Sequence, residues 1–252
     1  MSWLTSHLLS LDDKLAIADV YGEFSYLDLS KQVTIFNNKI TEEIKAGDVV
    51  VVLSDYNYYS IALLLALLKQ KAIIVPIVSK KEEEVSSRIK VSNCDWVINL
   101  EMEFLQIIKS EFAVSKHKLV NNLVDKKHSG LILFSSGSTG VPKAMVHDLD
   151  NLVDSFQGKK TKKLKILVFL MFDHIGGLNT LLNTLAMGAS VILPENRNPK
   201  YIGGLIEKYK VNVLPSTPTF LNMLLMARVN DKYNLKSLKM ITYGTETMPE
   251  SV

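Results

Sequence analysis

The chain has 252 residues, of which 47% are hydrophobic and 22% charged, with a formal net charge of +3 and one cysteine, Cys94. This composition excludes a disordered or disulfide-stabilised chain and suffices for one large domain or two modest ones, and the small charge excess indicates no particular partner. The most apolar run, residues 61–68, is far shorter than the roughly 20 residues that cross a bilayer, and no leader is visible, so we predict a cytoplasmic protein without a membrane span.

The first third of the chain alternates between strand and helix patterns. A turn at residues 21–23 between short apolar stretches predicts a small hairpin over 15–24. Apolar residues then recur at intervals of four and three from Leu29 to Ile44, which predicts an amphipathic helix that Gly47 ends. Strands are predicted over 48–53, 72–78 and 96–99, and helices over 58–69 and 80–91. This order predicts a doubly wound parallel sheet with right-handed crossovers.

The same alternation continues to residue 243. Further strands are predicted over 131–135, 144–147, 165–170, 190–193, 212–216 and 240–243, and further helices over 149–156, 178–185, 200–210 and 218–227. We therefore predict an α/β fold of stacked doubly wound sheets with helices on both faces. Residues 1–160 are expected to form a first subdomain that holds the loop described next. Residues 161–252 are expected to form a second subdomain, truncated at its C-terminal end.

The most informative stretch is residues 131–147, where an apolar strand enters a turn rich in hydroxyl groups and glycine that ends in a lysine. Gly137 and Gly140 allow a sharp turn, and the exposed amide groups of such a turn make an anion site. Lys143 adds a positive charge, and hydroxyl donors come from Ser135, Ser136, Ser138 and Thr139. Pro142 separates the glycines from the lysine, which excludes a Walker A loop. We predict a phosphate-binding loop with Lys143 as its catalytic residue; a plain surface turn is the alternative.

Residues 134–143 resemble the signature loop of the acyl-adenylate-forming (AMP-binding) superfamily, [YF]-[TS]-S-G-[ST]-T-G-x-P-K-G, in its acyl- and aryl-CoA-ligase-like form. The departures are Ser138, where threonine is commoner, and Ala144, where glycine usually follows the lysine; both are small residues. Residues 26–29 and 46–50 resemble the superfamily's Y-x-E-L and P-G-D-x-V segments. Residues 66–76 resemble L-K-x-G-A-x-x-V-P, with Lys71 in place of the glycine.

This resemblance implies ATP-dependent activation of a carboxylic acid as an acyl-adenylate, followed by thioester formation with the thiol of CoA or of a carrier protein. ATP, Mg²⁺ and CoA are the implied cofactors. Three alternatives stay open: a noncatalytic nucleotide- or acyl-binding module of the same fold, an amino-acid-activating adenylation domain, and an unrelated nucleotide-dependent α/β enzyme.

The resemblance also implies residues of a substrate pocket. Residues 172–177 read Phe-Asp-His-Ile-Gly-Gly and resemble the F-H-x-x-G motif, which assigns Asp173, His174, Gly176 and Gly177 to the pocket. Amino-acid-activating members also carry Phe-Asp here, where the aspartate anchors the amino group. The residues that follow Asp173 fit the CoA ligases better and favour an acid without an α-amino group. A helix-start histidine with a local hydrogen bond is the alternative for His174.

Two later segments complete the expected pocket. Thr217 and Pro218 lie in a stretch that resembles the P-x-x-P-T segment bordering the substrate. Residues 243–249 resemble Y-G-x-T-E superficially, but their context fits L-x-x-L-x-x-x-x-x-G-G-x-x-L-P better. On that interpretation Gly244, Thr245 and Glu246 edge the substrate and adenine pocket, Glu246 is no metal ligand, and no other metal ligand is predicted.

The remaining expectations concern partners. Five lysines fall within residues 159–165 without interleaved arginines or aromatic residues, so we predict a solvated loop and no nucleic-acid partner. Nothing before Val252 resembles the superfamily's later motifs. We therefore expect the front part of a longer enzyme that forms no adenylate alone and dimerises through an open sheet edge at residues 240–243.

Overall fold

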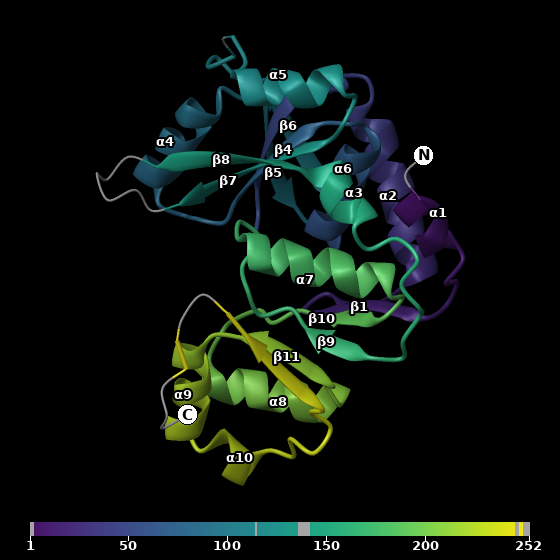
Figure 1. Ribbon diagram of the computed structural model, residues 1–252, viewed down its shortest axis with the longest axis vertical. Helices are drawn as coiled ribbons and strands as arrows, with labels where there is room; N and C mark the ends of the chain where they lie inside the picture. Colours follow the sequence, from purple (N-terminus) through teal and green to yellow (C-terminus); the bar gives the residue numbers. More distant parts are fainter. Residues whose placement is uncertain (1–2, 114, 136–141, 245–246, 249–252) are drawn as a thin grey trace.

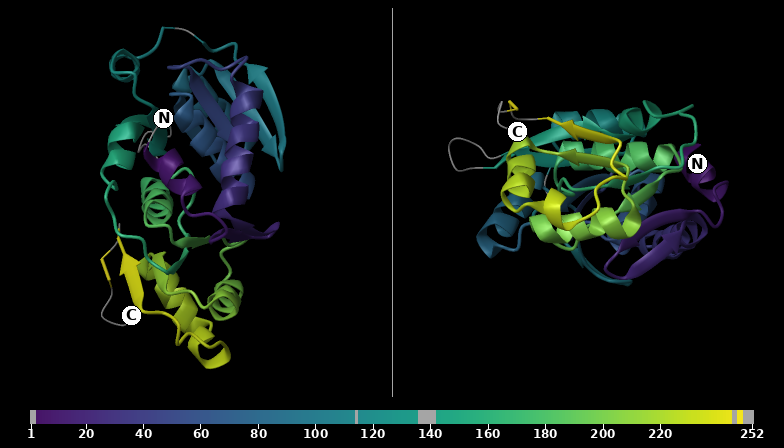
Figure 2. Two further views of the ribbon diagram at one scale, coloured as in Figure 1. Left: turned by 90° about the vertical axis from the view of Figure 1, so that its right-hand side faces the viewer. Right: turned by 90° about the horizontal axis from the view of Figure 1, so that it is seen from below.

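The computed structural model describes residues 3–113, 115–135, 142–244 and 247–248. Two six-stranded sheets are stacked with helices between them and further helices outside each sheet (Figure 1). In the side view of Figure 2, the two sheets lie one above the other along the long axis of the molecule. The predicted α/β class with stacked sheets is confirmed.

The first sheet has four parallel central strands and an antiparallel strand at each edge, in the order β6-β5-β3-β4-β7-β8. Its strands are β3 (Val49–Leu53), β4 (Ile73–Ile77), β5 (Trp96–Glu101), β6 (Phe104–Lys109), β7 (Gly130–Ser135) and β8 (Lys143–Asp148). Residues 49–52 and 73–77 are buried without interruption, because central parallel strands are covered on both faces.

The second sheet has the order β12-β11-β9-β10-β1-β2. Its strands are β1 (Leu15–Asp19), β2 (Gly22–Ser25), β9 (Lys165–Leu167), β10 (Ser190–Ile192), β11 (Val213–Ser216) and β12 (Met240–Tyr243). The predicted hairpin, β1 and β2, is confirmed, and it joins this sheet because β1 pairs in parallel with β10, with Ile17 opposite Val191. Whether residue 160 divides two separate units stays a prediction.

Ten helices lie within the described residues. They are α1 (Trp3–Leu9), α2 (Tyr26–Ile40), α3 (Tyr58–Lys69), α4 (Glu82–Ser92), α5 (Lys118–Asp125), α6 (Leu149–Asp154), α7 (Ile175–Ala186), α8 (Pro199–Tyr209), α9 (Pro218–Met226) and α10 (Val229–Lys232).

The helices form three layers around the sheets. Helices α2, α3 and α7 share one core with both sheets, and therefore lie between them. Helices α4 and α5 cover the outer face of the first sheet, while α8 and α9 cover the outer face of the second. Alternate residues of β3 serve the two faces: Val50 and Val52 belong to the middle core, and Val49 and Val51 to the core under α4 and α5.

The start of helix α2 is fixed by the side chains of its first turn. Ser25 caps its first turn, since the Ser25 hydroxyl accepts from Asp28 N–H and the Asp28 carboxylate accepts from Ser25 N–H. The helix ends at Ile40, so the prediction that Gly47 ends it was wrong. Gly47 instead forms a turn at φ +84°, where an added Cβ would lie 2.9 Å from the side chain of Val124.

Other element predictions need correction. Strand β9 ends at Leu167, opposite Ile192, the last residue of β10, and does not reach residue 170. The carbonyl oxygen of Phe169 accepts from Arg197 Nε at 2.9 Å. Helices α1, α5 and α10 and strand β6 were not predicted at all. The three helices are short, with 7, 8 and 4 residues, and β6 is an edge strand with Phe104 66% exposed, so its apolar residues do not mark a buried run.

Lys71, which stands where the superfamily motif has glycine, adopts the left-handed conformation that glycine favours, with φ +63°. Its Nζ lies 2.7 Å from Oδ1 of Asp150, whose side chain is only 10% exposed. The other carboxylate oxygen of Asp150 accepts from the Ser129 amide. The ion pair thus stabilises a lysine in a conformation that a side chain disfavours.

Candidate functional site

The predicted phosphate-binding loop joins the two strands of a hairpin at the edge of the first sheet. Strand β7 pairs antiparallel with β8 over six residue pairs, from Gly130 opposite Asp148 to Ser135 opposite Lys143. The predicted residues Ser136, Gly137, Ser138, Thr139 and Gly140 lie outside the described residues.

Lys143 is the described residue of this hairpin that is best suited to bind an anion. It is exposed and makes no ion pair with any residue that the structure describes. Ser135 lies opposite it at the other end of the loop and is half-buried. An ammonium group without an ion-pair partner among the described residues and a hydroxyl group therefore flank the loop, an arrangement that can bind an anion.

The predicted pocket residues 173–177 lie where β9 leads into α7. His174 caps α7, since its Nδ1 accepts from the Gly176 amide at 3.1 Å, and its side chain is exposed. This local hydrogen bond matches the alternative given above for His174. Gly177 is buried, and a Cβ there would lie 2.3 Å from the Met171 carbonyl oxygen. Gly177 thus permits the chain to pack closely at this turn.

Asp173 is bound by Arg88, which the sequence analysis did not single out. Arg88 Nη1 lies 2.9 Å from Asp173 Oδ2, and the two side chains are 17% and 13% exposed. Arg88 Nη2 binds Glu84, one turn earlier on α4, and the guanidinium group lies 5.5 Å from the ring centre of Phe134. Since Phe134 precedes Ser135 in β7, Arg88 connects the start of the loop to the start of α7.

A second arginine connects the two sheets at the same edge. Arg197 Nη1 lies 3.1 Å from Asp55, just after β3, and Arg197 Nε donates to Phe169, just after β9. Both ion pairs therefore lie at the carboxyl ends of parallel strands, where ligands of open α/β sheets bind. A signal for them existed in the sequence: of 29 basic residues only three are arginines, Arg88, Arg197 and Arg228. Arginine is favoured where a carboxylate must be held in a fixed geometry.

Tyr56 lies between these two ion pairs. Its ring packs on Phe172 with 4.9 Å between centres, and its hydroxyl oxygen is buried without a hydrogen-bond partner among the described residues. Burial is the main cause that raises the pKa of the Tyr56 phenol well above its usual value, and the nearby Asp55 carboxylate raises it further. The hydroxyl group therefore stays protonated at neutral pH and is a donor held at the junction of the sheets.

The remaining predicted residues lie at the ends of β11 and β12. Thr217 caps α9 by accepting from the Phe220 amide at 3.2 Å, and Pro218 is the first residue of that helix. The rings of Phe220 and Phe169 lie 4.1 Å apart, so the start of α9 adjoins the end of β9. Gly244 follows β12, whereas Thr245 and Glu246 lie outside the described residues.

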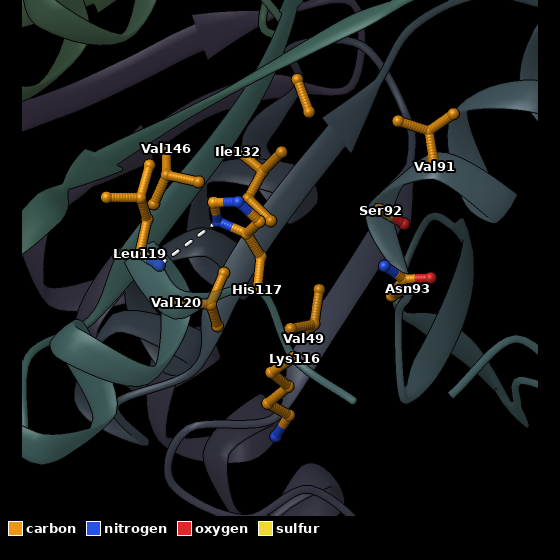
Figure 3. A pocket seen from close by; sticks show the side chains of 11 residues that line it. Val49, Val91, Ser92, Asn93, Lys116, His117, Leu119, Val120, Ile132 and Val146 are labelled. Carbon is orange, nitrogen blue, oxygen red and sulfur yellow. Dashed lines mark hydrogen bonds between the residues drawn. The ribbon is translucent and has the colours of Figure 1, made fainter. Parts of the chain in front are cut away.

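A separate hollow of about 170 Å³ lies under α4 and α5, on the outer face of the first sheet (Figure 3). None of the predicted site residues lines it. His117 points into it, but its Nδ1 accepts from the Leu119 amide as the cap of α5. Lys116 pairs with Asp48 and Asp95, so its charge is already compensated. These contacts give the polar residues of the hollow structural roles.

Among the described residues, no group of three or more His, Cys, Asp and Glu side chains could hold a metal ion. No helix in that part of the chain is long and apolar enough to cross a membrane.

Comparison with known sequences places this geometry in context. The sequence model of the AMP-binding enzyme family matches residues 10–252. The probable 4-coumarate–CoA ligase 2 of Dictyostelium discoideum is 28% identical over 192 residues, which are 73% of this chain and 33% of the relative. The nonribosomal peptide synthetase sirP of Leptosphaeria maculans is 25% identical over 266 residues, which are 95% of this chain and 11% of that protein. The chain thus spans a third or less of these relatives.

Comparison with solved structures supports the fold. The N-terminal domain of FACL13 from Mycobacterium tuberculosis, determined with an inhibitor bound, superposes with a TM-score of 0.80 at 17% sequence identity. The match covers 100% of this chain and 72% of that one. Both stacked sheets therefore recur in a known protein domain.

Proposed function

The chain belongs to the AMP-binding enzyme family, and from this premise we propose that it binds ATP at the β7–β8 hairpin and a carboxylic acid beside α7, as parts of an enzyme that forms acyl-adenylates. The observation that carries the proposal is the convergence of strand ends. Arg88 joins Phe134 of β7 to Asp173 after β9, and Arg197 joins Asp55 after β3 to Phe169 after β9. Lys143, which has no ion-pair partner among the described residues, supplies a positive charge near that edge.

In the proposed reaction, a carboxylate oxygen of the acid attacks the α-phosphorus of ATP. An acyl–phosphate bond forms, the bond from that phosphorus to the bridging oxygen breaks, and pyrophosphate leaves with the electron pair. Lys143 stabilises the negative charge of the phosphates, because a preorganised cation lowers the free energy of a state in which charge accumulates. Mg²⁺ bound to the phosphates would supply further charge compensation.

The second half-reaction is part of the same proposal. A thiol attacks the acyl carbon of the adenylate, a thioester forms, and AMP leaves. Relatives named as CoA ligases and as peptide synthetases support two classes of thiol, that of CoA and that of a carrier protein. Subdomains 1–160 and 161–252 would then present the loop and the acid pocket, respectively.

The experiment that tests the proposal measures binding and turnover separately. Differential scanning of the purified chain with ATP and Mg²⁺, and then with a panel of carboxylic acids, should raise Tm, since a ligand that binds only the folded state stabilises it. Exchange of labelled pyrophosphate into ATP, measured on the full-length protein with an acid that binds, then reports adenylate formation. Binding without exchange in the full-length protein would favour the noncatalytic module, and an unchanged Tm of the chain with ATP would contradict the proposal.

A further inference from the structure

The position of Arg88 suits it to control the selectivity of the proposed pocket for different acids. Arg88 lies on α4, outside the first sheet, and its guanidinium group donates to Asp173, which lies just before α7. The two residues are 85 positions apart in the sequence. The pair is mostly shielded from water, with the Arg88 side chain 17% and the Asp173 side chain 13% exposed. Water therefore screens this pair less than it screens ion pairs on the open surface.

Three contacts hold the guanidinium group in place. Nη1 donates to Asp173, Nη2 donates to Glu84, and the plane of the group lies near the Phe134 ring. Glu84 is 36% exposed and also accepts from the Ser79 hydroxyl at 2.7 Å, so its charge is partly screened and shared. Asp173 has no second ion-pair partner among the described residues, and Arg88 is its charge compensation.

The position of the pair connects it to both expected ligands. Asp173 precedes His174, the cap of α7, and follows Phe172, which packs on Tyr56. Phe134 precedes Ser135, where the phosphate-binding loop begins. Two further charged groups at this edge, Asp55 and Arg197, are paired with each other. The negative charge of Asp173 is therefore already compensated by Arg88. A cationic group on the acid would be repelled by the Arg88 cation beside it.

We propose that Arg88 determines the substrate class, so that the pocket accepts acids without an α-ammonium group and rejects amino acids. The inference rests on the proposed function, because it assumes that the acid binds beside Asp173. An ammonium group would have to displace Arg88 from Asp173, which leaves a mostly buried guanidinium group with one fewer partner. An acid with hydrogen atoms in place of the ammonium group leaves the pair intact.

The test uses pairs of ligands that differ only in the ammonium group, such as hexanoate with 2-aminohexanoate and 3-phenylpropanoate with phenylalanine. Calorimetry in the presence of ATP and Mg²⁺ gives the dissociation constants for the unaltered chain and its variants. The unaltered chain should bind the plain acid at least tenfold more tightly than its amino counterpart. Arg88→Met should reduce this ratio at least tenfold, because Asp173 becomes available to the ammonium group.

Two variants separate this role from a structural one. Arg88→Lys keeps a cation and should keep most of the preference, and Arg88→Met combined with Asp173→Asn should show no gain in amino-acid binding. If Arg88→Met does not fold, Arg88→Gln replaces it, since glutamine keeps a hydrogen bond to Asp173 without the charge. An equal loss of affinity for both ligands of a pair would overturn the inference and leave the proposed function standing. If the chain binds ATP but none of the acids, both the proposed function and this inference would be overturned.

Discussion

Ser135 lies directly opposite Lys143 in the antiparallel ladder of β7 and β8. Residues that face each other in such a ladder have Cβ atoms about 5 Å apart, so the loop between them starts and ends at nearly the same point. The hydroxyl group and the ammonium group are thus positioned by a sheet, although the loop that they flank has only polar and small residues up to Val141. This makes Lys143 the residue with which to test the anion site.

Replacement of Lys143 with alanine should weaken ATP binding about tenfold, since one charge-assisted contact to phosphate is worth roughly 1.5 kcal/mol or more. Lys109→Ala is a matched control, because Lys109 is an exposed lysine that ends a strand of the same sheet. Its affinity for ATP should stay within twofold of the original, as measured by calorimetry. Unchanged ATP affinity after Lys143→Ala together with Gly137→Val would rule out the loop as a phosphate site.

The two glycines at the start of α7 should respond differently to substitution. In Gly177→Ala, the new Cβ would meet the Met171 carbonyl oxygen at 2.3 Å, and a backbone atom cannot move away without distorting the turn. We expect a loss of about 3 kcal/mol in unfolding free energy. In Gly176→Ala the nearest atom is Leu170 Cδ1 at 2.9 Å, the end of a flexible side chain. Urea denaturation of the two variants should therefore differ clearly, and similar midpoints would contradict this explanation.

Much of the fold was predictable because buried runs carry a local signal. The valines at 49–52 predicted a central parallel strand, and the Tyr21-Gly22-Glu23 turn predicted the β1–β2 hairpin. The partner of that hairpin was not predictable, since nothing near Ile17 indicates that it pairs with Val191. The rarity of arginine marked Arg88 as unusual, but its partner Asp173 was not predictable, because the contact depends on tertiary structure and leaves no periodic pattern.

Substitutions of Lys71 can compare the cost of its positive φ with the stabilisation that its ion pair provides. Its ion pair with the mostly buried Asp150 compensates for a positive φ that costs a residue with a Cβ roughly 1 kcal/mol. Lys71→Ala keeps the strain and loses the pair, so unfolding free energy should fall by about 1 kcal/mol. Lys71→Gly loses the pair but also the strain, and should remain close to the original. Thermal or urea unfolding would contradict this if the glycine variant were the less stable of the two.

The phenol of Tyr26 should make the protein sensitive to alkaline pH. Burial raises the pKa of Tyr26, and its hydroxyl group donates to the Ala189 carbonyl at 2.7 Å. In the unfolded chain a tyrosine loses its proton near pH 10. Above about pH 10 the folded state therefore binds more protons than the unfolded state, and stability must fall as pH rises. Tyr26→Phe removes this contribution, so its loss of stability between about pH 9 and 11 should be smaller.

An exposed-residue control accompanies that measurement. Tyr21→Phe alters a side chain that is 45% exposed and should leave the alkaline dependence as it is. If Tyr26→Phe and the original protein lose stability in parallel from neutral to alkaline pH, the buried phenol is not the cause.

Strand β12 is the expected site of self-association. Among the described residues it pairs with β11 alone, and Met240, Ile241 and Tyr243 are 46–56% exposed beside an apolar hollow of about 380 Å³. Unpaired strand edges with apolar side chains favour pairing with another chain. Sedimentation equilibrium should therefore detect a dimer, and Ile241→Lys should weaken it at least tenfold. Leu119→Lys, an exposed leucine distant from β12, is the control and should leave the dimer unchanged.

The pairing of β1 with β10 also affects how the chain can fold during its synthesis. Tyr26 and Ala189 are hydrogen-bonded across 163 residues, and every strand of the first sheet lies between them in the chain. On the ribosome the first sheet can be complete while the β1–β2 hairpin still lacks its neighbour. Contacts at such separation slow folding, because a long loop must close before they form. The nascent hairpin is therefore the segment most in need of protection until residue 192 has emerged.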